Sequence, residues 1–219
     1  MTAGSGKSRS PVRLPVIRIH DWIALVTLIF LISGCSTHYT PKPEGYFRIQ
    51  LPEKKYKSLT DGRFYQFDYP VYGYLVPYRG AYQESDTANW TNIDFPGFNS
   101  RLHLTYKPVT TNLGELVQDA HEYVMKHTIK ADAIMQTRFD HPEERVFGVL
   151  FDIRGNAASA VQFYLTDSVA HFLRGALYFN NEPNYDSLSP VINYLRDDIV
   201  KIMETLKWKQ SGDDNKHTQ

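Results

Sequence analysis

Hydrophobic and polar residues alternate along several short stretches of the chain, a pattern typical of half-buried β-strands. The alternation is clearest at 101–107, where Leu102, Leu104 and Tyr106 share one face of the predicted strand. Very short connections such as Arg154-Gly155-Asn156 require antiparallel neighbours. The predicted strands are Tyr46–Leu51, Phe64–Tyr69, Tyr72–Val76, Trp90–Phe95, Arg101–Lys107, Ile134–Phe139, Val146–Ile153, Ala158–Thr166 and Val169–Phe179.

Two segments have the helical period instead. The first is predicted at 112–129, with Asn112 as its N-cap and Glu115 three residues later, a variant of the capping box. The second is predicted to begin at Ser189, with Pro190 at the first helical position. Its apolar stripe consists of Val191, Leu195, Ile199, Ile202, Met203 and Leu206.

Sequential antiparallel strands with helices on their faces predict an α+β sandwich, an antiparallel β-sheet flanked by helices. The segment from F-L-R-G-A-L-Y-F-N at 172–180 through D-S-L-S-P-V at 186–191 is similar to the PsbP-like fold. This similarity is one of pattern, and it implies an antiparallel sheet between helices.

The first thirty-five residues have the layout of a secretory signal peptide. Four basic residues precede an apolar run at Trp22–Ser33. A helix of that length would be ~18 Å long, which is too short for a hydrocarbon core of ~30 Å. The run ends in Ile32-Ser33-Gly34-Cys35, which resembles the bacterial lipobox and contains the single cysteine of the chain.

The lipobox resemblance implies that the Cys35 thiol is lipidated and that a signal peptidase cuts between Gly34 and Cys35, after which the new amino group is acylated, typically with palmitate. An uncleaved membrane anchor and an inert cysteine remain as alternatives. We therefore expect a signal peptide at 1–34, a lipidated N-terminus and extended tether at 35–45, one domain at 46–208 and a disordered tail at 209–219.

Charge gives little indication of nucleic-acid binding. The chain has 24 Lys and Arg against 24 Asp and Glu, a formal net charge of zero. Removing the basic leader would leave a slightly acidic chain without the basic stripe that nucleic acid requires. We expect no nucleic-acid partner.

Catalytic motifs are not evident in the sequence. His121-Glu122 begins like a zinc-protease motif, but Met125 stands where the second ligand belongs and His127 is out of phase. Ser159 and Ser168 lack the glycines of a serine-hydrolase elbow. Asp197 and Asp198 are predicted to lie on a solvated helix face, and His103, His141 and His171 are scattered. We expect a non-enzyme without cofactor or metal.

Aromatic residues are dense between Phe64 and Tyr82. Rings of this kind pack well on a pleated sheet, and tyrosine also suits protein interfaces and sugar faces. Core packing, a protein interface and glycan stacking therefore all remain open. Asp86-Thr87-Ala88 fits the loose O-glycosylation pattern of exported Bacteroidetes proteins, so Thr87 is a possible modification site.

Three further stretches carry a resemblance over nearly the whole predicted mature chain: Y-T-P-K-P-E-G-Y-F-R-I-Q-L-P-E-K-K-Y at 39–56, W-T-N-I-D-F-P at 90–96 and I-R-G-N-A-A-S-A-V-Q-F-Y-L-T-D-S at 153–168. They resemble the GldD family of gliding motility lipoproteins of the Bacteroidetes. The resemblance implies an anchored motility component that works beside other gliding lipoproteins and the type IX secretion apparatus, with no known catalytic activity or cofactor.

Surface-displayed lipoproteins of the Bacteroidetes tend to carry acidic residues directly after the lipidated cysteine. Here Ser36-Thr37-His38 follows the cysteine, and no acidic residue occurs before Glu44. We therefore expect the domain to face the periplasm. The outer membrane is preferred over the inner membrane. The alternative function is an envelope glycan-binding protein or a hydrolase with an unrecognised active site, which a cleft gathering His103, His121 or His171 with carboxylates would favour.

Overall fold

The clearest alternating stretch of the sequence becomes strand β5 (Ser100–Pro108), which lies inside a seven-stranded antiparallel sheet of order β3-β4-β5-β9-β8-β7-β6. Leu102, Leu104 and Tyr106 are buried on one face of β5, as their spacing predicts. Strand β8 is buried along its whole length, because both faces of the sheet are covered at its centre.

The computed structural model describes residue 20 and residues 49–60, 64–77 and 90–209. A second, three-stranded sheet has the order β1-β2-β10. The bounds are β1 (Tyr56–Leu59), β2 (Tyr65–Pro70), β3 (Tyr74–Pro77), β4 (Trp90–Phe95), α2 (Leu113–Met125), β6 (Ala131–His141), β7 (Val146–Gly155), β8 (Ser159–Thr166), β9 (His171–Phe179), α3 (Tyr185–Thr205) and β10 (Lys207–Trp208), with 3-10 turns η2 (Pro96–Phe98) and η3 (Pro142–Glu144).

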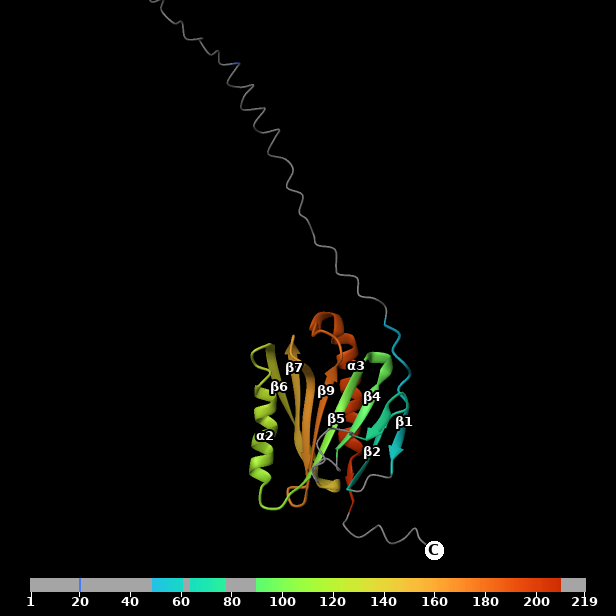
Figure 1. Cartoon of the computed structure of the whole chain (residues 1–219), viewed down its shortest axis with the longest axis vertical. Coiled ribbons are helices and arrows are strands. Elements are labelled where there is room, and N and C mark those ends of the chain that lie inside the picture. Colours follow the sequence, from blue (N-terminus) through green and yellow to red (C-terminus); the bar gives the residue numbers. More distant parts are fainter. Residues whose placement is uncertain (1–19, 21–48, 61–63, 78–89, 210–219) are drawn as a thin grey trace, which may run out of the picture. The chain divides into compact units, whose positions relative to one another are not determined.

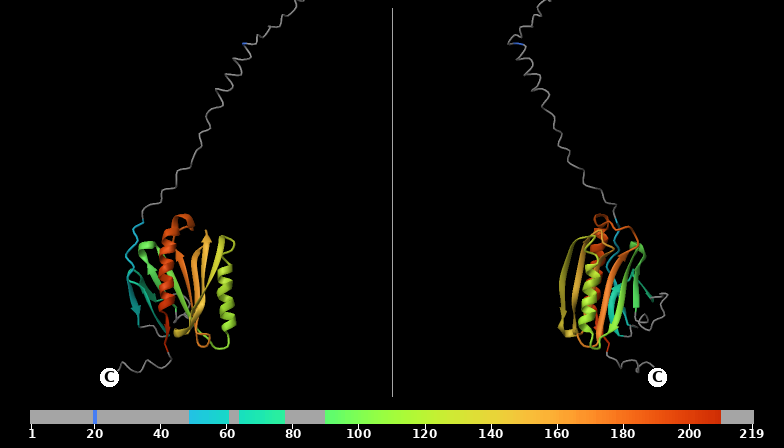
Figure 2. Two further views of the ribbon diagram at one scale, coloured as in Figure 1. Left: turned by 180° about the vertical axis from the view of Figure 1, so that it is seen from behind. Right: turned by 60° about the vertical axis from the view of Figure 1, so that its left-hand side comes forward.

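The helices cover opposite faces of the large sheet. In Figure 1, α3 lies behind the sheet, and in the rear view of Figure 2 it lies in front. The main core forms between α3, the three-stranded sheet and one face of the large sheet. A smaller core forms where Leu116, Ala120 and Val124 of α2 pack on the other face. The predicted α+β architecture is confirmed.

Helix α3 begins one turn earlier than the sequence predicted. Its N-cap is Asn184, whose side chain accepts a hydrogen bond from Ser187 N at 3.2 Å, so Pro190 lies inside the helix. Proline cannot donate to the carbonyl four residues earlier, that of Asp186. The Ser189 hydroxyl donates to this carbonyl at 3.1 Å instead, and the helix therefore accommodates the proline. The predicted apolar stripe is confirmed, since every member is buried.

Helix α2 also differs at both ends. Asn112 occupies the N-cap position, but its side chain accepts from Thr110 N at 3.1 Å and makes no capping bond. The competing local turn explains why the predicted capping box does not form. The helix ends at Met125, and the predicted extension to 129 is wrong, because 126–130 form turns.

The predicted strand at 46–51 is wrong over residues 49–51, the part of it that the structure describes. Residues 49–51 belong to no strand, and Ile49 and Leu51 are 40% and 42% exposed. The sequence analysis predicted neither strand β1 (Tyr56–Leu59), which follows, nor strand β10. Lys209, placed in the expected tail, donates its backbone N–H to Phe64 O at 2.9 Å; 210–219 lie outside the described residues.

The aromatic stretch is mainly core. Tyr65, Phe67 and Tyr69 are buried in the main core, whereas Tyr74 is 59% exposed. Strand β2 pairs with β1 and β10 along its two edges, and α3 packs against it. The later aromatics of the stretch, Tyr78 and Tyr82, lie outside the described residues.

We expect Gly175→Ala to lower stability. A Cβ at Gly175 would lie 2.1 Å from Cε1 of Phe163, whose ring covers this glycine from the neighbouring strand. Overpacking of this kind destabilises by about 1–3 kcal/mol, to be measured by urea unfolding. Gly114→Ala is the matched control, because nothing lies within 4 Å of its Cβ position in α2. It should raise stability by about 0.5–1 kcal/mol, and equal effects would contradict the packing of Phe163 on Gly175.

Candidate functional site: the joint between the N-terminal strap and helix α3

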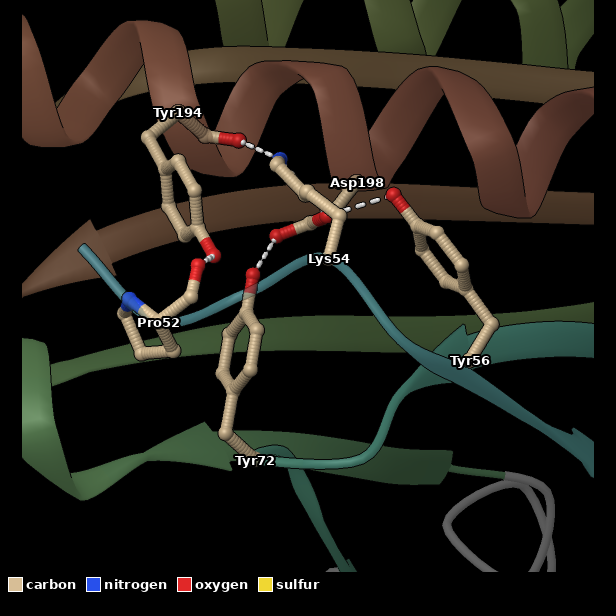
Figure 3. Close-up of polar contacts among 6 residues, drawn as sticks. All are labelled: Pro52, Lys54, Tyr56, Tyr72, Tyr194 and Asp198. Atoms are coloured by element: carbon tan, nitrogen blue, oxygen red, sulfur yellow. Dashed lines mark hydrogen bonds and ion pairs between the residues drawn. The ribbon is translucent and has the colours of Figure 1, made fainter.

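Residues 49–56, here called the strap, form the first described part of the domain after the predicted tether. From Pro52 onward the strap alternates, with Lys54 and Tyr56 half-buried and Glu53 and Lys55 exposed. The alternation directs Lys54 and Tyr56 toward α3, a helix near the other end of the chain (Figure 3). The strap is extended by β1, which pairs antiparallel with β2.

Asp198 of α3 is the centre of this joint. Its side chain is fully buried, so the predicted solvated face is wrong for Asp198 and holds only for its exposed neighbour Asp197. Asp198 lies three residues after Leu195 and four before Ile202, which places it within the apolar stripe. This spacing was the sequence signal for burial, and the sequence analysis missed it.

Three donors from other segments satisfy the buried carboxylate. Lys54 Nζ lies 2.8 Å from Asp198 Oδ1, and the Tyr56 hydroxyl donates to the same oxygen at 2.9 Å. The Tyr72 hydroxyl donates to Oδ2 (Figure 3). Buried carboxylates are stable only when paired and hydrogen-bonded in this way.

Tyr194 adds a second level of contacts one helical turn before Asp198. Its carbonyl accepts from Lys54 Nζ at 2.5 Å, and its hydroxyl donates to Pro52 O at 2.5 Å (Figure 3). The Lys54 ammonium also lies 3.8 Å from the Tyr194 ring centroid, a cation–π contact. The backbone carbonyl and the side-chain hydroxyl of Tyr194 therefore both bind the strap.

The phenols of the joint remain protonated. Burial raises the pKa of Tyr56 and of Tyr72 well above the usual range, and the hydrogen bond of each to Asp198 raises it further. Burial also raises the pKa of Tyr194. The three hydroxyls therefore stay neutral at physiological pH, and each donates a hydrogen bond within the joint that holds the strap on α3.

The candidate histidines and serines make structural contacts with their neighbours. They do not gather into one site. The His121 ring meets Phe151 edge-on at 5.1 Å, and the His171 ring stacks on Trp208 at 5.0 Å. Ser159 Oγ donates to Leu177 O at 2.9 Å, and Ser168 is a turn residue with φ 66°. Within the described ranges, no group of three or more His, Cys, Asp or Glu residues could hold a metal.

Gly34, Cys35 and Thr87 lie outside the described residues, so the lipidation, cleavage and glycosylation sites remain predictions. The apolar run Trp22–Ser33 lies outside them as well. In the part of the chain that is described, no helix has the length and apolarity needed to cross a membrane.

The fold and the joint define a class: an α+β domain with an antiparallel sheet between helices, entered through a strap fixed on its last helix. The family model described as gliding motility lipoprotein GldD matches residues 36–208. The chain belongs to this family of gliding motility lipoproteins.

Two other comparisons complete the picture. No curated protein matches the chain. Among solved structures, the chain is similar to the solution structure of cyanobacterial PsbP (CyanoP) from Synechocystis sp. PCC 6803, at 13% identity and a TM-score of 0.40, over 77% of this chain and 100% of that chain.

Proposed function

We propose that this lipoprotein is a non-catalytic, periplasm-facing component of the Bacteroidetes gliding and type IX secretion machinery that acts through protein–protein contacts. Cleavage after Gly34 and lipidation of Cys35 anchor it, and the outer membrane is preferred over the inner membrane. Residues 35–45 form the tether and 46–208 form the single domain.

The strap joint is the observation that carries this proposal. Any mechanical force between a lipid on Cys35 and a partner bound to the domain must pass through the strap, because the strap is the covalent connection between tether and domain. The joint fixes the strap to α3, which lies in the main core. A domain attached in this way can transmit load from its anchor without first unravelling at its N-terminus.

Affinity capture tests the proposed partners. We expect a chain tagged after residue 209, crosslinked in living cells and recovered from detergent-solubilised envelopes, to carry gliding lipoproteins or type IX secretion components identified by mass spectrometry. Weak contacts become effective when lipid anchors confine both partners to a membrane.

The control is the same tagged chain with Cys35→Ser, which lacks the predicted lipid. Recovery should fall several-fold in this variant if docking requires confinement to the membrane. Capture that contains no component of either machinery, from a chain confirmed to be folded and membrane-bound, would contradict the proposal.

One observation favours the alternative, an envelope glycan-binding protein or hydrolase. A pocket of about 130 Å³ between α2 and strands β4, β5 and β9 contains Trp90, Tyr123, Asp119 and Arg174. However, the Tyr123 ring already holds Arg174 at 4.5 Å and Lys126 at 5.0 Å from its centroid. The ring is thus less available to stack on a sugar, and we place this function second.

A further inference from the structure

The α2 face of the large sheet carries a cation that has no acidic partner. Arg174 stands on β9 between Thr105 of β5 and Tyr164 of β8, its direct neighbours in the sheet. Its guanidinium is partly buried, because the Tyr123 ring of α2 lies over it, with 4.5 Å between the ring centroid and Cζ. In the described ranges, no ion pair joins Arg174 to a carboxylate. Since burial of a charge is costly unless an opposite charge compensates it, an anion bound here would stabilise the arginine.

Gln162 of β8 holds this guanidinium in one orientation. Arg174 Nη2 donates to Gln162 Oε1 at 2.7 Å. A guanidinium has only donors, so the amide oxygen must face it and the amide nitrogen must point away. Gln162 is 1% exposed, and its Nε2 is buried without a hydrogen-bond partner among the described residues. Local costs of this kind are typical of functional sites. A guanidinium carries five N–H donors, so its contacts with Gln162 and Tyr178 leave others for a ligand.

The surroundings of Arg174 have a positive potential. The pKa of His103 on β5 is lowered first by burial and then by Arg101 and Arg174, whereas Asp94 acts in the opposite direction. Burial and Arg174 also lower the pKa of His127, which follows α2. The arginines act in this way because a positive charge disfavours a second one nearby. Arg101 is itself paired with Asp94, so Arg174 is the arginine of this face that lacks a counter-charge.

A pocket of about 130 Å³ lies beside Arg174, between α2 and strands β4, β5 and β9. Its walls are mostly apolar or aromatic and include Trp90 and Phe172. The other charged residues of its lining are Lys107 and Asp119, both exposed at the rim. These two residues have opposite charges. The lining therefore keeps one net positive charge, that of Arg174.

The volume of the pocket suits one amino-acid side chain. Sites for small molecules and cofactors commonly have volumes of about 300–1,000 Å³, well above that of this pocket. At about 30 Å³ for each water in the liquid, the pocket has the volume of roughly four water molecules. An apolar wall suits the methylene groups of an acidic side chain, and Arg174 suits its carboxylate, because a guanidinium and a carboxylate can form two parallel hydrogen bonds.

We propose that this pocket binds an acidic side chain, Asp or Glu, of another protein of the cell envelope, with Arg174 pairing with its carboxylate. The inference rests on the proposed function only in that the partner is a protein. A side chain that fills a pocket and pairs with a partly buried arginine is a common form of interface hot spot. Tyr123 at the rim is 47% exposed. The partner surface around the inserted side chain rests on α2 and on strands β5 and β4, which extend past α2 (Figure 1).

Zero-length crosslinking reports the chemistry of the occupant. A carbodiimide joins a lysine amine to a carboxylate in contact with it, forming an amide with loss of water, and arginine does not form this bond. We expect the full chain with Arg174→Lys, treated in native envelopes, to give crosslinked peptides in which residue 174 is joined to Asp or Glu of another protein. Mass spectrometry identifies these peptides. The substitution keeps a positive charge at the same position of β9, so the partner should still bind.

Two chains control for other lysines. The wild type measures coupling through Lys107 at the rim of the pocket. Arg154→Lys makes the same chemical change at an exposed position of β7, beside a groove on the α3 side of the sheet. Amides to other proteins should be several-fold rarer at residue 154 than at residue 174.

A double variant tests whether the charge is needed for binding. Arg174→Met together with Gln162→Met replaces both partners of the internal hydrogen bond by apolar groups of similar shape, a change that is often nearly neutral for stability. Recovery of crosslinked envelope proteins by the tagged chain should fall several-fold in this variant, whereas its Tm should stay close to that of the wild type. Arg154→Met is the matched control and should recover the same proteins as the wild type.

The outcomes separate this inference from the proposed function. An amide between residue 174 and an acidic side chain of another protein, together with lower recovery by the double variant, supports the pocket. The inference is overturned if a folded, membrane-bound Arg174→Lys chain gives no such amide. It is also overturned if the amide forms only with Asp119 of the same chain, with a second copy of the chain or with a sugar acid.

Capture separates the two proposals further. If the wild type and the double variant recover gliding or secretion components equally, the proposed function stands and this inference is overturned. An amide between residue 174 and a protein outside both machineries would support this inference and count against the proposed function.

Discussion

The Asp198→Asn variant is expected to lose about 3–5 kcal/mol of unfolding free energy, the usual effect of removing one partner of a buried ion pair. The amide that replaces the carboxylate cannot balance the Lys54 charge, and it cannot accept as strongly from the hydroxyls of Tyr56 and Tyr72. For a domain of this size, the change corresponds to a fall of roughly 10 °C in Tm. Calorimetry and urea unfolding measure both quantities.

The neighbouring residue supplies the control. Asp197→Asn makes the same chemical change at an exposed position of α3, and it should alter stability by less than about 0.5 kcal/mol. Hydrogen exchange should show faster exchange in the strap of the Asp198→Asn variant and an unchanged strap in the control. Equal stability of the two variants would mean that the joint does not hold the strap.

A double variant separates loss of the ion pair from loss of packing. Replacing the paired charges together, as in Lys54→Met with Asp198→Asn, removes the uncompensated ammonium. Replacing both members of a buried pair by groups of similar size is often close to neutral. The double variant should therefore recover part of the lost stability, although the Tyr72 contact with residue 198 stays weakened.

The Cys35→Ser variant should lose the lipid and the membrane retention that the lipid provides. A hydroxyl is not the thiolate nucleophile that lipid transfer requires, and without lipidation the precursor should keep its leader. Two or three acyl chains give stable anchoring, whereas a single chain is marginal. The measurements are envelope fractionation and the intact mass of the N-terminus.

Ser36→Ala is the matched control for Cys35→Ser, because it changes the adjacent residue and leaves Ile32-Ser33-Gly34-Cys35 intact. It should be processed and retained like the wild type. A Cys35→Ser chain with wild-type mobility and retention would contradict the lipid anchor and favour an uncleaved anchor. A bare Cys35 at the mature N-terminus of the wild type would also contradict the lipid anchor, although it would show that the leader had been cleaved.

Local patterns were sufficient for most strands of the large sheet but not for the three-stranded sheet, of which β1 and β10 were missed. The period of two in 101–107 and the short connection at 154–156 predicted neighbouring antiparallel strands, and the structure confirms them. Such features depend on neighbours in sequence, on side-chain direction and on turn length, so a single chain reveals them. The helix termini were harder, because Asn112 has a competing hydrogen-bond partner in Thr110.

The candidate site could not be derived in the same way. Its contacts join residues about 140 positions apart, such as Lys54 with Asp198 and Pro52 with Tyr194. The stripe position of Asp198 was visible in the sequence, but the lysine and the tyrosines that make its burial favourable were not. A charged residue can occupy an apolar stripe only if distant segments supply its partners.

The sequence by itself determined the alternating strands, the apolar stripe of the last helix, the lipobox resemblance and the family resemblance. Only the tertiary structure decided that Asp198 is buried, that the strap lies on α3 and that β6 is the last strand of the large sheet in the described part of the chain. The physical reason is that periodicity and motifs are local properties of the chain. Burial, charge compensation and strand order arise when segments distant in sequence come together.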